Sequence, residues 1–287
     1  MNGIIVINKE KNMTSRDVVN IVSKKLGTKK VGHSGTLDPL ATGVLVLGVN
    51  KYTKVLPLLD NMDKEYVAEV LIGKSYDTLD ITGNLIEEKE INDLDKEKLD
   101  KVILSFKKTY LQEIPLYSAK KINGKKLYEY AREGKEVELP KKEVSIYDIK
   151  LLDVYKKENE YYFKVYCKVS KGTFIRSLIN DISKEMNIPM SMSNLERIKV
   201  GNFDIKDSNE LDDEEYKYYH IEDIFDYPVY KLNDGEYFRV KNGVSLPGDN
   251  YGDIVLFKYN GEEIAIYKKE NNMMKVLLML KWYYLQN

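Results

Sequence analysis

The sequence predicts an α+β fold followed by a small β-rich unit. Strand-like and helix-like segments are interspersed up to about residue 225, whereas the apolar segments after Pro228 are short and strand-like. A block with one lysine and nine acidic residues, 207–226, separates the two regions. At 287 residues the chain is long enough for two domains, and we expect their boundary near 225–228.

Each element follows from its local pattern. Helices are predicted where apolar residues recur every three or four positions, and strands where they run together or alternate. The clearest helix has one stripe of apolar residues, from Ile175 to Met186. In order, we predict a strand over 3–8, a helix over 15–26 capped by Thr14 or Ser15, strands over 43–49 and 65–72, a short helix over 125–133, a hairpin over 144–155 and 161–169, a helix over 173–186, and strands over 253–258, 263–268 and 273–280.

Composition excludes several classes of protein. One cysteine, Cys167, and two histidines, His33 and His220, argue against a zinc or histidine-rich metal site, so no metal or cofactor is expected. The apolar runs are too short to span a bilayer, and the N-terminus lacks the apolar core of a signal peptide. We therefore expect a cytoplasmic protein with no membrane association.

The net charge of −1 excludes a uniformly basic surface but hides local ones. Residues 1–37 carry seven basic and two acidic side chains, and residues 117–142 carry eight and four. Such runs are commonly solvated faces, yet they can also bind nucleic acid.

Arginine is rare in this chain. Of 45 basic residues, five are arginines: Arg16, Arg132, Arg176, Arg197 and Arg239. Because lysine supplies positive charge almost everywhere else, an arginine is a candidate for a position that needs a planar, two-pronged donor. A plain surface position is the alternative for any one of them.

The densest chemical pattern is KVGHSGTLDPLATG, residues 30–43. Its three glycines permit close backbone approaches, and Pro39 forces Asp38 into an extended conformation. An acid in a rigid loop before a buried strand suits a catalytic carboxylate. An aspartate in a turn is also commonly a capping residue.

A second segment, SKGTFIR over 170–176, opens the predicted helix 173–186. Lys171 opposes the helix dipole there, which favours an anion such as phosphate at this end. Arg176 lies beside the apolar stripe, so it either points inward to a buried acid or extends along the surface.

A third segment, IPLYSAKKINGKKLYEYAREG over 114–134, interleaves tyrosines with basic residues. Lysines follow a phosphate backbone and aromatic rings stack on unpaired bases, so the segment suits single-stranded nucleic acid. An ordinary lysine-rich surface is an equal alternative in a chain with 23 tyrosines.

Two familiar ligand loops are excluded by residue type. Residues 30–43 contain no Gly-Lys-Ser/Thr, so this glycine-rich loop is not a phosphate-binding loop. Residues 76–88 superficially resemble a calcium loop, but Leu79 and Ile81 occupy positions that must supply oxygen ligands.

Together these segments resemble the bacterial tRNA pseudouridine-55 synthases, the TruB-like family. The resemblance runs over about residues 1–206 and implies a catalytic domain with a mixed, mainly antiparallel sheet and flanking helices, residues 1–226. It implies a small β-rich, PUA-like RNA-binding domain over 227–287. The matching segments are VGHSGTLDPLATGVLVLGVNKYTK (31–54), KEYVAEVLIG (64–73), DTLDITG (77–83), IPLYSAKKINGKKLYEYAREG (114–134) and VSKGTFIRSLINDIS (169–183).

The resemblance also implies roles for particular residues. Asp38 matches the catalytic aspartate, Arg176 the arginine that pairs with it, and Tyr66 the tyrosine that packs against the target base. His33 matches a histidine that helps the RNA loop to open. Lys9 matches a lysine of the N-terminal segment, although Glu10 replaces the usual proline. The other expected RNA contacts are Gly35, Thr36, Tyr117, Lys120, Lys121, Lys125 and Lys171.

The implied reaction converts uridine 55 in the tRNA T loop to pseudouridine without a cofactor. The base leaves the stack, and Asp38 acts as nucleophile or base while Arg176 keeps it ionised. Attack on the base and attack on the ribose both stay open. The expected partner is the T stem-loop of tRNA, bound by a monomer that needs no other protein.

Two other functions share these features. A non-catalytic RNA-binding or folding protein would use the same basic and aromatic surface, and a base-excising glycosylase would also flip a base. Product analysis distinguishes the three, since they yield unchanged RNA, free uracil, or pseudouridine in an intact chain.

Overall fold

A nine-stranded sheet organises the larger part of the computed structural model, which describes residues 2–248 and 250–281. Its strands are antiparallel, except that β12 runs parallel to β3 where they meet in the middle of the sheet. The predicted mixed, mainly antiparallel sheet is confirmed. The strand order is β1 (Gly3–Lys9), β3 (Thr42–Val49), β12 (Met190–Val200), β4 (Lys64–Ile72), β11 (Glu160–Val169), β10 (Lys141–Lys157) and β7 (Thr109–Glu113), with β2 (Val31–Ser34) beside β3 and β13 (Phe203–Asp204) beside β12.

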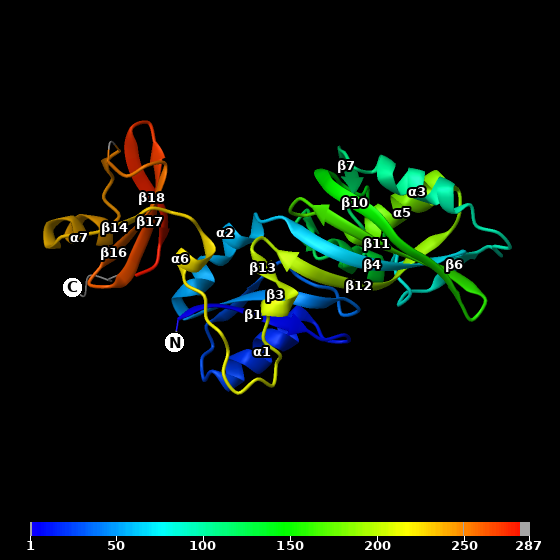
Figure 1. Ribbon diagram of the computed structural model, residues 1–287, viewed down its shortest axis with the longest axis horizontal. Helices are drawn as coiled ribbons and strands as arrows, with labels where there is room; N and C mark the ends of the chain where they lie inside the picture. The colour runs from blue at the N-terminus through cyan, green and yellow to red at the C-terminus, as the bar shows by residue number, and fades with distance from the viewer. Residues whose placement is uncertain (1, 249, 282–287) are drawn as a thin grey trace.

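Helices and two small hairpins flank this sheet (Figure 1). At the start of α1 the Thr14 hydroxyl accepts a hydrogen bond from the Asp17 amide, and the Asp17 carboxylate accepts one from the Thr14 amide. The flanking elements are α1 (Ser15–Lys25), η1 (Asn50–Lys54), α2 (Leu56–Asp60), α3 (Lys96–Ser105), α4 (Leu127–Arg132), α5 (Ile175–Met186), η2 (Ile205–Asp207), hairpin β5 (Lys74–Tyr76) with β6 (Leu85–Glu88), and hairpin β8 (Lys121–Ile122) with β9 (Lys125–Lys126).

The main core lies between one face of the sheet and the helices α1, α3 and α5. The apolar stripe predicted for the last of these is buried there, including Leu178, Ile179 and Ile182. Cys167 is also fully buried in this core, as its place on the apolar face of its strand predicted.

The C-terminal region forms a second, five-stranded sheet at one end of the molecule (Figure 1). The predicted β-rich unit is therefore confirmed, and it also contains a capped helix after its first strand, which the strand-like pattern after Pro228 did not predict. The elements are α6 (Ile221–Ile224), β14 (Val229–Lys231), α7 (Asp234–Lys241), β15 (Leu246–Pro247), β16 (Ile254–Tyr259), β17 (Glu262–Glu270) and β18 (Met273–Met279).

The two sheets share a second apolar cluster. Ile4 and Val46, on the strand faces opposite the main core, pack in one cluster with Leu256 and Ile266 of the C-terminal sheet. Tyr52 is fully buried at this junction, and its hydroxyl donates to the Glu263 carboxylate. The apolar cluster and this polar contact fasten the C-terminal sheet to the back of β1 and β3.

None of the helices within residues 2–248 and 250–281 has the length and hydrophobicity needed to cross a membrane.

Candidate active site

A cleft of about 860 Å³ brings the three chemically patterned segments together. Asp38 comes from the glycine-rich loop, Tyr117 and Lys120 from the basic–aromatic segment, and Lys171 and Arg176 from the segment that opens α5. The other lining residues come from α2, β4, β10, β12 and the loops beside them.

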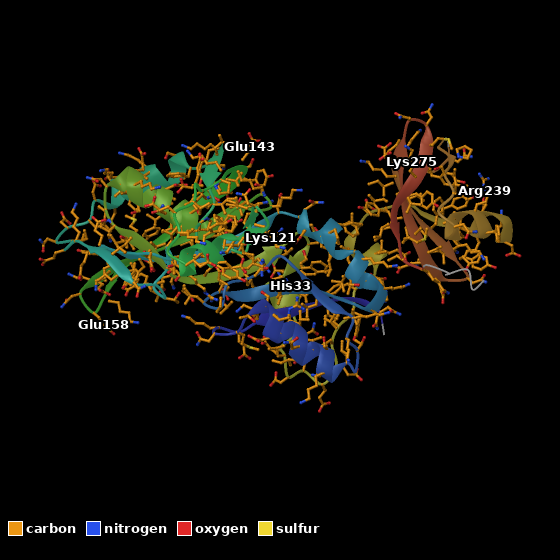
Figure 2. The ribbon with its side chains drawn as sticks, turned by 180° about the vertical axis from the view of Figure 1, so that it is seen from behind. His33, Lys121, Glu143, Glu158, Arg239 and Lys275 are labelled. Carbon is orange, nitrogen blue, oxygen red and sulfur yellow. The ribbon has the colours of Figure 1, made fainter. Side chains whose placement is uncertain are left out.

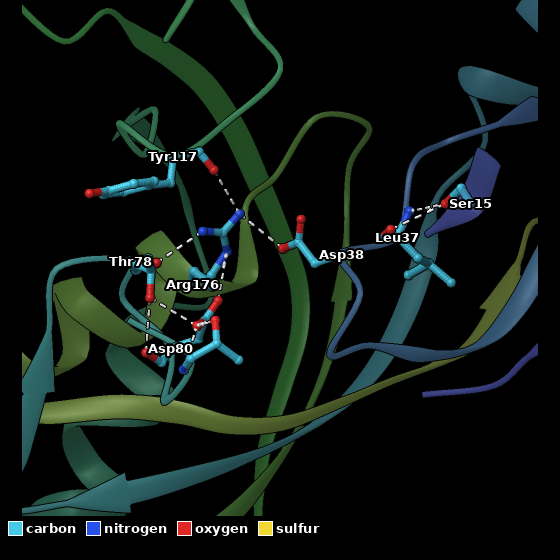
Figure 3. Close-up of polar contacts among 8 residues, drawn as sticks. Ser15, Leu37, Asp38, Thr78, Asp80, Tyr117 and Arg176 are labelled. Atoms are coloured by element: carbon cyan, nitrogen blue, oxygen red, sulfur yellow. Dashed lines mark hydrogen bonds and ion pairs between the residues drawn. The ribbon is translucent and has the colours of Figure 1, made fainter. Parts of the chain in front are cut away.

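The loop that carries Asp38 joins β2 to β3 and is anchored on the start of α1. The Ser15 hydroxyl donates to the Leu37 carbonyl at 3.1 Å and accepts from the Leu37 amide at 2.9 Å (Figure 3). The Asn12 amide donates to the Pro39 carbonyl at 2.7 Å. Leu37 and Leu40 are buried, so the loop offers its carboxylate from a fixed backbone.

Arg176 points into the cleft and pairs with Asp38. Its Nη2 lies 2.9 Å from Asp38 Oδ2 and donates to the Tyr117 carbonyl at 3.1 Å, while Nη1 donates to the Thr78 carbonyl at 2.9 Å (Figure 3). The Arg176 side chain is 7% exposed and that of Asp38 is 38% exposed. The buried Arg176 guanidinium is therefore held by one carboxylate and two backbone carbonyls, and the Asp38 carboxylate remains accessible to a ligand.

A second carboxylate, Asp80, lies behind Arg176. Its Oδ2 is 3.8 Å from Arg176 Nε, and its side chain is 7% exposed. Asp80 Oδ1 accepts hydrogen bonds from the Thr78 hydroxyl, and from the Thr82 amide and hydroxyl. The family resemblance covers the stretch 77–83, but sequence reasoning assigned no role to Asp80 within it. The Thr-x-Asp-x-Thr pattern, which supplies those donors, was the available signal.

Tyr66 lines the same cleft from β4. It is 7% exposed and lies between Cys167 of β11 and Arg197 of β12 in the strand pairing. The sheet thus fixes the ring on the face that holds the main core and the cleft, where a planar ligand can pack on it.

Four lysines line the cleft: Lys64, Lys120, Lys142 and Lys171. Burial, followed by the charges of Lys171 and Lys120, lowers the pKa of Lys142. Lys142 Nζ donates to the Lys171 carbonyl at 3.1 Å, and Lys171 Nζ contacts Asn61. Cations this close together favour an anionic ligand.

The N-terminus of α5 lies two residues after the predicted helix start at residue 173. The helix begins at Ile175, four residues after Lys171, and the Phe174 amide donates to buried Gln112 at 2.8 Å. That amide is therefore already satisfied, and attraction for an anion rests on the lysines.

Comparison with known proteins identifies the chain. Residues 23–175, just over half of it, match the TruB family pseudouridylate synthase N-terminal domain. The chain belongs to the TruB family. It is 37% identical over 294 residues to the tRNA pseudouridine synthase B of Lactobacillus acidophilus, covering 98% of both chains. It is 40% identical to that of Mesoplasma florum over 94% of both, and 38% to that of Bacillus pumilus over 96% of both.

Solved structures agree on the fold. A chain of an H/ACA RNP bound to a substrate RNA containing 2′-deoxyuridine superposes with a TM-score of 0.68 at 22% identity, covering 97% of this chain and 85% of that one. A chain of a Cbf5–Nop10–Gar1 complex gives the same score and identity. These similarities extend over both sheets, so the C-terminal unit also belongs to the shared architecture.

Membership of the TruB family does not place every expected residue in the cleft. Gly35 and Thr36 line it, but Lys121 and Lys125 lie on the β8–β9 hairpin outside its lining. Lys121 is exposed (Figure 2), while Lys125 pairs with Glu133. Both can meet only a ligand larger than the cleft.

His33 lies on β2, half-buried and outside the cleft lining (Figure 2). Burial, helped by the charges of Arg16 and Arg197, lowers the pKa of His33, which favours the neutral ring. Its buried Nδ1 has no hydrogen-bond partner among the described residues.

Lys9 corrects an expectation drawn from the TruB resemblance. It is fully buried, so the predicted direct contact with RNA is wrong. Its Nζ donates to the carbonyls of Met13 at 2.7 Å, Glu10 at 2.8 Å and Pro39 at 3.5 Å, and burial lowers its pKa to about 8. Lys9 braces the Asp38 loop from inside the protein.

Within residues 2–248 and 250–281 no three His, Cys, Asp or Glu side chains gather as metal ligands do.

Proposed function

We propose that this protein is a tRNA pseudouridine synthase that converts uridine 55 of the T loop to pseudouridine. The observation that carries the proposal is the Arg176–Asp38 ion pair in a cleft whose volume, about 860 Å³, lies within the range of ligand sites. The curated relatives that bear the name tRNA pseudouridine synthase B support the same reaction and substrate.

The reaction exchanges one glycosidic bond for another. The ribose C1′ leaves N1 of the base and bonds to C5, and the proton on C5 is lost while N1 gains one, so substrate and product are isomers. Asp38 initiates this exchange as nucleophile or base. Arg176 holds the Asp38 carboxylate in place through their 2.9 Å ion pair.

The remaining lining residues hold the substrate. Tyr66 packs against the flipped base, which repays part of the few kcal/mol needed to take a base out of its stack. Lys120, Lys142 and Lys171 attract the phosphates on either side of the flipped nucleotide. Exposed Lys121 of the β8–β9 hairpin extends this surface to the T stem-loop.

The proposed protein has a catalytic domain and an RNA-binding domain. Residues 1–226 form the synthase domain, and residues 227–287 form a PUA-like unit that binds the tRNA beyond the T loop. The protein acts as a monomer in the cytoplasm, where it meets its tRNA substrate.

A defined tRNA transcript tests the proposal directly. After incubation with the protein, we expect pseudouridine at position 55 alone, and none in a transcript with cytidine there. Free uracil in place of pseudouridine would identify a glycosylase. Binding without any change in the RNA would leave only a binding or folding function.

A further inference from the structure

Arg197 is the largest fully buried side chain among the described residues. It lies on β12 at the parallel junction of the sheet, paired with Gly43 of β3 on one side and with Tyr66 of β4 on the other. It is 1% exposed, yet it is among the residues that line the cleft. One strand position thus borders both the loop of Asp38 and the strand of Tyr66.

The guanidinium joins the two ends of the Asp38 loop. Nε donates to the Val44 carbonyl at 2.7 Å, and Nη2 donates to the Gly35 carbonyl at 2.9 Å. Because the guanidinium is planar and rigid, these two bonds set the separation between the ends of the loop. A lysine ammonium can also donate to two carbonyls, but from a single nitrogen, so it cannot keep the Val44 and Gly35 carbonyls at the separation set by Nε and Nη2.

The loop backbone lies directly against Arg197. A Cβ at Gly43 would come within 2.3 Å of the Arg197 carbonyl oxygen, and a Cβ at Gly35 within 3.3 Å of its Nη1. Both glycines also have positive φ, +97° and +69°. Each end of the loop therefore needs a glycine to reach the arginine.

The charge of Arg197 is not balanced locally. Within the described residues no carboxylate lies within 4.0 Å of its guanidinium, and the neighbouring buried cations Lys9 and Lys64 also bind carbonyls. Burying a charge without a counter-ion is costly, and an apolar side chain of similar size would be cheaper. Burial lowers the pKa of Lys9 to about 8, and the charge of Asp38 acts in the opposite direction.

We propose that Arg197 is a positioning residue that holds the Asp38 loop at its working separation from Tyr66. The inference rests on the proposed function. It concerns a residue that does not touch the ion pair of Asp38 and Arg176, and it explains why an arginine stands at a fully buried strand position.

Two variants separate the parts of this role. Arg197→Met retains most of the volume and loses the charge and both hydrogen bonds, whereas Arg197→Lys retains the charge and loses the bridge. Lys101→Met, at a 79% exposed position on α3 and outside the cleft lining, is the control. For each we would measure the thermal midpoint, the Kd for tRNA and the single-turnover rate with enzyme in excess.

We expect Arg197→Met to slow the single-turnover rate at least 100-fold while the Kd for tRNA stays within about threefold. Arg197→Lys should lose about tenfold in rate, because it cannot bridge the Val44 and Gly35 carbonyls. If Arg197→Met does not fold, the single-turnover rate of Arg197→Lys alone tests the inference.

Three results would overturn the inference. A folded Arg197→Met, or in its absence Arg197→Lys, could react at the wild-type rate. Either variant could bind tRNA tenfold more weakly with an unchanged rate at saturation, which would make Arg197 an RNA contact. The rate could also fall only in proportion to the unfolded fraction, which would make the residue merely architectural. Absence of pseudouridine with the wild-type protein would instead overturn the proposed function and this inference together.

Discussion

Arg176→Lys tests the centre of the site most directly. Lysine retains the charge but replaces three guanidinium nitrogens by one, so it cannot reach Asp38, Tyr117 and Thr78 together. A hydrogen bond to a charged group contributes about 1.5–3 kcal/mol. If the bond to Asp38 is lost in the transition state, the chemical step should slow about 10- to 150-fold, at about 1.4 kcal/mol per factor of ten.

The measurement is a single-turnover reaction with enzyme in excess over tRNA labelled with tritium at C5 of uridine, since bond formation at C5 releases that label. The thermal midpoint would be recorded in parallel, because contacts to buried carbonyls are lost as well. Lys101→Arg, at a 79% exposed position on α3 outside the cleft lining, serves as the control. A rate within threefold of the wild type in a stably folded Arg176→Lys would refute the role assigned to the guanidinium.

Other parts of the site give further predictions. Asp38→Asn should abolish turnover and leave the Kd for tRNA within a few-fold, and any appreciable pseudouridine would remove Asp38 from the chemistry. Tyr66→Phe should remain active and Tyr66→Leu should be impaired if the ring only supports the base, whereas failure of both would assign proton transfer to the hydroxyl. Burial raises the pKa of the Cys167 thiol to about 12, so a thiol reagent at pH 8 should modify the unfolded protein and not the native one. A variant with four lysines changed to glutamine, Lys120, Lys121, Lys125 and Lys126, should bind tRNA more weakly. The slope of its log affinity against log salt concentration should also flatten, by up to about one unit per lost phosphate contact. Unchanged affinity and slope would show that the segment is only a solvated face.

Elements with a regular apolar repeat were predictable from the sequence, and others were not. The helix predicted over 173–186 is α5, and the hairpin of β10 and β11 was anticipated. The central strand β12 was not, because its buried positions include Ser191, Ser193 and Arg197 and therefore break the apolar alternation. β2 was taken as part of a glycine-rich loop, because a four-residue strand that contains Gly32 and His33 has no apolar run.

The site was predictable where residue chemistry was unusual. A scarce arginine beside an apolar stripe indicated the inward Arg176, and the glycine-rich loop indicated Asp38. Asp80 was not predictable in the same way, because its contact with Arg176 depends on how the loop 77–83 folds against α5. The error at Lys9 has a related cause: resemblance transfers a residue type, whereas burial decides whether that residue reaches RNA.

The parallel junction of β3 and β12 has a consequence for synthesis of the chain on the ribosome. Val44 and Arg197 are 153 residues apart in the sequence. At roughly 5–20 residues per second, Arg197 is therefore synthesised about 8–30 s after the Asp38 loop that it binds. Until then β3 and β4 lack the strand that separates them and expose apolar edges, which makes the nascent chain prone to aggregation. The enzyme cannot bind its substrate productively before that late strand inserts, so an incomplete chain is inactive on tRNA.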